Sequence, residues 1–120
     1  MMEFEDKVND IIGKKYDSES FHCYSLVEYL VPYAPKLEGT AKSLSCGLSH
    51  FKSELSQHKL KKITEFKDKD LMVLGRNGIM FHIGVYYQDG VIHNTESDGV
   101  IYQSMATIKS LYSNIEGLRV

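Results

Sequence analysis

Apolar residues recur at helical spacing through the first half of the chain. The first set covers residues 2–12 at positions i, i+4, i+7 and i+8: Phe4, Val8, Ile11 and Ile12. It predicts an amphipathic helix, with Gly13 as its C-terminal cap. The second set predicts a helix over 21–31, which Pro32 ends: Leu26, Val27, Leu30 and Val31. The third set predicts a helix over 41–57: Leu44, Leu48, Phe51 and Leu55.

The pattern changes to short apolar and β-branched segments after residue 60. It predicts strands over 60–66, 70–74, 79–87, 91–95, 100–102 and 115–120, and a helical turn over 107–112. Segments rich in Gly, Asn and Asp separate several of these strands. Helices followed by antiparallel strands indicate an α+β fold, with N-terminal helices packed on an antiparallel β-meander. The 120 residues contain no linker, so we expect one domain over 1–120.

Charge and hydropathy exclude two classes of partner. A net charge of −2 gives no electrostatic basis for a nucleic-acid partner. No apolar run approaches the roughly 20 residues of a membrane span. Residues 1–10 are acidic and amphipathic, unlike a secretion signal. We therefore expect cytoplasmic synthesis without a signal peptide, or export by a route that leaves no N-terminal mark.

The chain has two cysteines, Cys23 and Cys46, so one bridge within the chain is possible. No C-x-x-C spacing is present, and the pair fits no zinc knuckle. Two cysteines do not make a disulfide framework. We predict two unpaired thiols in a reducing compartment.

Cys23 lies at the start of the helix predicted over 21–31. Unpaired N–H groups and the macrodipole at a helix N-terminus favour an anion, which lowers the pKa of a thiol held there. The Ser25-x-x-Glu28 segment also matches a capping box. A helix that began at Ser25 would leave Cys23 outside the first turn and remove most of this effect.

A cysteine nucleophile needs a base, and the predicted hairpin contains two candidates, His82 and His93. Alternation along the strand puts His82, Gly84 and Tyr86 on one face and bulky apolar residues on the other. Gly84 leaves room for another backbone to approach, and we expect the helix N-terminus with Cys23 to use this space.

The register of the hairpin decides whether His93 reaches His82. With Gln88-Asp89 as the loop, His93 pairs with Gly84 and lies one diagonal step from His82. With Asp89-Gly90 as a type I′ turn, His93 lies too far along the strand, and a three-residue loop places it on the opposite face. Turn propensity favours Asp89-Gly90, whereas the chemistry needs the first register.

Four motifs occur in the order found in NlpC/P60 cysteine peptidases, and the chain especially resembles the short, phage tail-associated members. The motifs are Gly13-Lys-Lys-Tyr16, Phe-His-Cys23-Tyr-Ser-Leu-Val, Lys-Asp70-Leu-Met-Val-Leu and His82-Ile-Gly-Val-Tyr-Tyr-Gln-Asp-Gly-Val-Ile-His93. The resemblance spans nearly the whole chain from Gly13 onward. The strand that begins at His82 and leads to a second histidine is its most specific part.

The resemblance implies a papain-like α+β fold and hydrolysis of amide bonds in peptidoglycan stem peptides. Cys23 would be the nucleophile, His82 the base and His93 the residue that orients His82, with Tyr16 near the oxyanion. No cofactor and no metal are implied. The implied partners are the peptide substrate and phage tail or other assembly proteins, with the protein virion-associated or delivered to the cell wall.

Two alternatives stay open. The chain departs from the family pattern at His22, Ser25 and Lys69, where Asp, Gly and Gly are usual, and this is compatible with a non-catalytic structural or tail-assembly protein that retains the fold. Cys23, His82 and His93 together could instead bind a metal ion. We expect an exposed His22, and we interpret the remaining candidates as structural or solvent-facing: Cys46, His50 and His58.

Overall fold

The computed structural model describes residues 3–17, 21–35 and 60–120. The described helices are α1 (Phe4–Ile11), α2 (Cys23–Leu30) and α5 (Met105–Leu111). The strands are β1 (Lys61–Ile63), β2 (Leu71–Arg76), β3 (Ile79–Tyr86), β4 (Gly90–Thr95), β5 (Gly99–Ser104) and β6 (Asn114–Arg119). The helix predicted over 41–57, together with Cys46, His50 and His58, lies outside the described residues. None of the described helices is long and apolar enough to cross a membrane.

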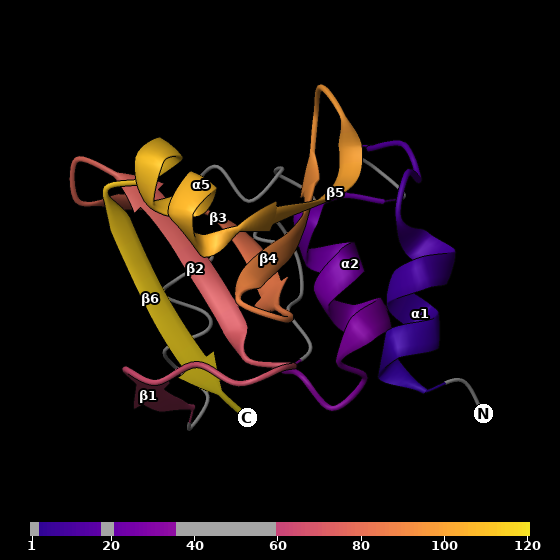
Figure 1. Ribbon diagram of the computed structural model, residues 1–120, viewed down its shortest axis with the longest axis horizontal. Coiled ribbons are helices and arrows are strands. Elements are labelled where there is room, and N and C mark those ends of the chain that lie inside the picture. Colours follow the sequence, from indigo (N-terminus) through magenta and orange to yellow (C-terminus); the bar gives the residue numbers. More distant parts are fainter. Residues whose placement is uncertain (1–2, 18–20, 36–59) are drawn as a thin grey trace.

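The strands form one six-stranded antiparallel sheet in the order β1-β6-β2-β3-β4-β5 (Figure 1). Strands β2 to β5 follow one another as the predicted meander. Strand β6 instead returns after α5 and lies between β1 and β2. The α+β prediction is therefore confirmed, with helices first and an antiparallel sheet after them.

Helices cover both faces of the sheet. Helices α1 and α2 lie side by side on one face, where they bury one apolar cluster with Ile83 and Val85 of β3 (Figure 1). Helix α5 covers the other face and buries Met105 and Ile108 against a second cluster. The β3 strand therefore contributes alternate side chains to two separate cores, as the period of two along a strand requires.

Helix α1 ends as the sequence predicts. Gly13 follows the helix with a φ of +92°, in the left-handed region that glycine adopts without a Cβ clash. Val8 and Ile11 are buried, and Phe4 packs at the edge of the same cluster. Ile12, predicted on the apolar face, is 44% exposed because the helix ends before it.

The β3–β4 hairpin adopts the Gln88-Asp89 loop. Both residues have positive φ, 43° and 56°, and His93 pairs with Gly84. Tertiary contacts outweigh turn propensity here. A Cβ on Gly90 would lie 2.4 Å from the Tyr102 ring, and Met105 N–H donates to the Asp89 carbonyl at 2.9 Å. Gly90 is thus needed for close packing against β5 and begins β4 rather than completing the turn.

Candidate functional site

The site lies where β3 and β4 stop pairing. Their ladder runs from Tyr86–Val91 to Gly84–His93 and ends there, although both strands continue. The start of α2 is attached at this point, since Asn94 Nδ2 donates to the carbonyls of Phe21 at 3.0 Å and His22 at 3.2 Å. The residue after His93 therefore positions the backbone that leads into Cys23.

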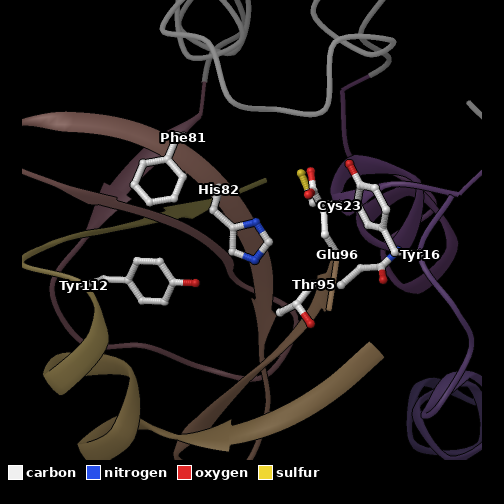
Figure 2. A pocket seen from close by; sticks show the side chains of 8 residues that line it. Tyr16, Cys23, Phe81, His82, Thr95, Glu96 and Tyr112 are labelled. Atoms are coloured by element: carbon white, nitrogen blue, oxygen red, sulfur yellow. The ribbon is translucent and has the colours of Figure 1, made fainter. Parts of the chain in front are cut away.

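A cavity of about 270 Å³ opens at the same place. The residues that line it are Tyr16, Cys23, Phe81, His82, Asn94, Thr95, Glu96 and Tyr112. Figure 2 shows Cys23 and His82 between Tyr16 on one side and the rings of Phe81 and Tyr112 on the other. The structure thus brings Tyr16, Cys23 and His82, which are separated in sequence, to one cavity.

Helix α2 begins at Cys23 because His22 and Ser25 cap it. The Nδ1 atom of His22 accepts from Tyr24 N–H at 3.3 Å, and His22 N–H donates to Ser25 Oγ at 3.1 Å. Ser25 therefore completes a reciprocal cap from inside the helix and does not begin it. His22 and Ser25, two of the three residues that depart from the NlpC/P60 pattern, therefore form this cap together.

The expectation of an exposed His22 is wrong. Its exposed fraction is 2%, and its ring is turned inward by the capping bond to the backbone. A neutral imidazole with an unprotonated Nδ1 supplies the acceptor that Asp or Ser supplies at most helix N-termini.

The prediction of an unpaired thiol is also wrong for Cys23. The residue is 2% exposed and its sulfur is disulfide-bonded. Cys46, the other cysteine of the chain, lies outside the described residues. A sulfur in a disulfide has no proton to lose, so the effect of the helix N-terminus on a thiol applies only after reduction.

A line of side chains leads from the cavity into the sheet. His82 Nε2 lies 2.8 Å from His93 Nδ1, and His93 Nε2 lies 2.7 Å from Gln103 Oε1 on β5. The Gly84–His93 register produces the first contact, because it places the two histidines diagonally on one face. The second contact follows in the same way, since Gln103 pairs with Val91, two residues before His93.

Aromatic packing holds the two imidazoles in place. The Tyr112 ring is stacked on His82, with centroids 6.0 Å apart, and meets His93 edge-on at 6.4 Å. The Arg76 guanidinium also lies over the Tyr112 ring, 5.0 Å from its centroid. Tyr112 therefore fixes the ring planes of both histidines from the side of α5.

Both imidazoles favour the neutral form. Burial lowers the pKa of His82 well below its usual value, and repulsion from the Arg76 charge, and from His93 whenever that ring is protonated, lowers it further. Burial also lowers the pKa of His93, against a smaller opposing effect of the hydrogen bond to Gln103. Both rings are therefore uncharged at neutral pH, and the low pKa of about 3 also makes His82 a weaker base than a free imidazole.

The space at Gly84 has a different occupant from the one expected. A Cβ on Gly84 would lie 2.6 Å from the Ile92 carbonyl oxygen and 2.9 Å from His93 Cβ. Strand β4 therefore makes the close approach, whereas α2 packs on the opposite face of β3. Cys23 reaches the cavity at the end of the β3–β4 ladder and does not cross over Gly84.

Sequence reasoning did not assign six residues of the site: Phe81, Asn94, Thr95, Glu96, Gln103 and Tyr112. Phe81 and Asn94 carried a signal, because each adjoins a candidate histidine. Gln103 and Tyr112 reach the site only through the pairing of β5 and the packing of α5.

A Cys23–His82–His93 metal site is not favoured by the geometry. His82 Nε2 and His93 Nδ1 face each other at hydrogen-bond distance, so these two nitrogens cannot both coordinate one ion. Within residues 3–17, 21–35 and 60–120 no three His, Cys, Asp or Glu side chains form a group suited to a metal.

Comparison with known proteins gives a likeness of fold. No protein-family model matches the chain, and no curated protein matches it in sequence. Among solved structures, the chain is similar to the NlpC/p60 domain of the peptidoglycan hydrolase SagA, with a TM-score of 0.57 and 16% identity. The match covers 95% of this chain and 94% of that domain. The chain therefore has an NlpC/p60-like, papain-like α+β fold.

Proposed function

We propose that the protein is a cysteine hydrolase that cleaves amide bonds in peptidoglycan stem peptides. One observation carries the proposal: His82, which is hydrogen-bonded to His93, lines the same cavity as Cys23. The likeness to a peptidoglycan hydrolase domain supports the substrate class. Cys23 is the nucleophile, His82 the base and His93 the residue that orients His82.

The reaction begins from reduced protein. His82 Nδ1 accepts the thiol proton of Cys23, and the thiolate attacks the amide carbonyl to form a carbon–sulfur bond. The tetrahedral intermediate collapses as the carbon–nitrogen bond breaks, and His82 donates its proton to the leaving amine. A water molecule, deprotonated by His82, then attacks the thioester, and the carboxylic acid leaves as the Cys23 thiol forms again.

The negative charge that develops on the carbonyl oxygen in the tetrahedral intermediate requires hydrogen-bond donors at the cavity. The backbone N–H of Cys23 lies at the N-terminus of α2, and the Tyr16 side chain lines the same cavity. In the proposed reaction both donate hydrogen bonds to the oxyanion. The sequence resemblance to tail-associated proteins implies delivery to the cell wall, so intact sacculi are the relevant substrate.

A second function is favoured by the disulfide at Cys23. A protein that keeps this sulfur bonded while it functions would be a non-catalytic structural or tail-assembly protein that retains the fold. The two functions differ in their response to a reductant.

The test digests purified sacculi, with and without dithiothreitol, and identifies released peptides by mass spectrometry. Reduced wild type should release peptides with new termini at stem-peptide amide bonds, and the oxidised protein should release none. Cys23→Ala should be inactive under both conditions. Cys46→Ser, which cannot form a bridge within the chain, should be active without reductant.

Two outcomes would contradict the proposal. Equal hydrolysis by Cys23→Ala would exclude Cys23 as the nucleophile. No hydrolysis by reduced wild type, with Cys23 and Cys46 alkylated by iodoacetamide equally slowly near neutral pH, would favour the non-catalytic function, because an activated thiol reacts preferentially.

A further inference from the structure

We propose that Gln103 is a positioning residue that sets the protonation sites of both histidines, and so determines which nitrogen of His82 can act as a base. The inference rests on the proposed function for its catalytic consequence. Its structural basis is the continuous line from Gln103 Oε1 through His93 to His82, with contacts of 2.7 and 2.8 Å.

The direction of each hydrogen bond follows from its acceptor. An amide oxygen can only accept, so His93 Nε2 carries a proton and donates to Gln103 Oε1. A neutral imidazole has one N–H, and His93 Nδ1 is therefore unprotonated and accepts from His82 Nε2–H. The proton of His82 is then on Nε2, and its Nδ1 keeps the lone pair needed to accept the Cys23 proton.

The neutrality of the pair makes this direction decisive. Burial lowers the pKa values of both histidines, so each ring carries a single proton at neutral pH. If His93 carried its proton on Nδ1 instead, it would donate to His82 Nε2, and His82 would hold its proton on Nδ1. That tautomer cannot accept a proton from a thiol, and a wrongly set tautomer costs orders of magnitude in triads of this type.

The position of Gln103 suits this role. It lies on β5, on the sheet face shared with Val91 and His93, and is half-buried. It has no place in the cavity lining, so it acts on the reacting atoms only through His93.

Two substitutions distinguish the role of Gln103 as a hydrogen-bond acceptor from its role in packing. Gln103→Glu keeps an acceptor and cannot donate when ionised, so His82 and His93 should keep their tautomers and at least a third of the hydrolysis rate should remain. Gln103→Met fills a similar volume without an acceptor. It should lower kcat roughly 10- to 100-fold, less than the loss of the base itself, with little change in KM or melting temperature. Lys109→Met, at an exposed position of α5 away from the hairpin and the cavity lining, is the control and should leave the rate unchanged.

The tautomers are measured directly by ¹⁵N NMR of histidine side chains in the oxidised protein. Wild type should show both rings protonated at Nε2, and Gln103→Met should show a mixed population for His93. The proposal is overturned if wild-type His82 is protonated at Nδ1, or if Gln103→Met leaves both tautomers unchanged. The NMR measurement requires no catalytic activity, so it decides the role of Gln103 even if the reduced wild-type protein proves inactive.

Discussion

At the scale of single residues, the site depends on two histidines that stay neutral inside the protein. Their neutrality results mainly from burial, and their contact joins rings that are both packed on Tyr112. The same burial lowers the stability of the folded protein at acidic pH, because both rings can be protonated freely only in the unfolded chain.

The stability of the oxidised protein should therefore fall as the pH falls. The folded-state pKa values of His82 and His93 lie below the ordinary 6.5, so the unfolded state binds more protons below that pH. The contribution is fully present above about pH 6.5 and is lost below it, by up to about 1.4 kcal/mol per pH unit for each histidine. Urea unfolding at pH 7, 6 and 5 measures this slope.

The control for this prediction is the double variant His82→Gln/His93→Gln, which retains the other three histidines of the chain. Its free energy of unfolding should depend less steeply on pH. Identical slopes for the double variant and wild type would mean that neither imidazole is shielded from protons in the folded state.

Substitutions of His93 should separate the orienting residue from the base. A neutral acceptor can orient His82, so His93→Asn and His93→Gln should retain measurable hydrolysis, whereas His93→Leu should lose roughly 10²-fold or more. His82→Gln should be as inactive as Cys23→Ala, because an amide cannot accept a proton near neutral pH. Release of peptides from sacculi by reduced protein measures all five variants. Wild-type activity in His93→Leu would remove His93 from the mechanism.

At the scale of elements, the hairpin of β3 and β4 determines the geometry of the site. The Gln88-Asp89 loop places His93 opposite Gly84, and the ladder then ends so that the start of α2 can attach to Asn94. Only glycine fits opposite His93 at this separation of the strands, since a Cβ there would lie 2.6 Å from the Ile92 carbonyl oxygen and 2.9 Å from His93 Cβ.

Gly84→Ala should therefore damage both the hairpin and the site. The added methyl group would lie 2.6 Å from the Ile92 carbonyl oxygen, and relief requires the two strands to separate. We expect a loss of about 1–3 kcal/mol in the free energy of unfolding, and a weakened His82–His93 contact visible as changed ring NMR shifts.

Gly117→Ala is the matched control for this substitution. The nearest atoms to its added Cβ belong to the Phe66 side chain, 2.6 Å away, and a side chain can move where a strand cannot. The histidine NMR shifts should not change in this variant. If Gly84→Ala also left them unchanged, the close approach at Gly84 would have no part in positioning His93.

At the scale of the whole molecule, β6 is an interior strand that pairs with a strand on each side. It lies between β1 and β2, and its Arg119 forms a bidentate pair with Asp70, which is 3% exposed, with both contacts at 2.8 Å. Asp70 also accepts from Lys67 N–H at 2.7 Å. Asp70 of the Lys-Asp70 motif thus has a structural role, because it bonds to β6 and to the backbone before β2. Lys69 adopts a φ of +80°, where a glycine would be unstrained.

Arg119→Met should lower the free energy of unfolding by about 1–3 kcal/mol, because Asp70 would remain buried with its charge only partly compensated. Lys62→Met is the control, since Lys62 lies 3.8 Å from Glu116 with its side chain 74% exposed, and it should change stability by less than about 1 kcal/mol. Urea unfolding compares the two. Equal losses would mean that the Asp70–Arg119 pair contributes no more than a surface ion pair.

The sequence by itself determined the local elements and the α+β class. Helical spacing located α1 and α2, and β-branched runs with turn residues located the strands, because these patterns depend on neighbours within a few positions. The motif order also identified Tyr16, Cys23, His82 and His93 as candidates, and the structure places three of them at one cavity with His93 bonded behind His82.

Only the tertiary structure decided the features that depend on contacts between distant segments. The hairpin register was set by Tyr102 and Met105 packing around the loop, against the preference of Asp89-Gly90 for a turn. The burial of His22, the disulfide bond of Cys23 and the arrival of Gln103 behind His93 likewise depend on residues brought together by folding. Local propensity carries a few tenths to about 1 kcal/mol per residue, so one buried contact can reverse it.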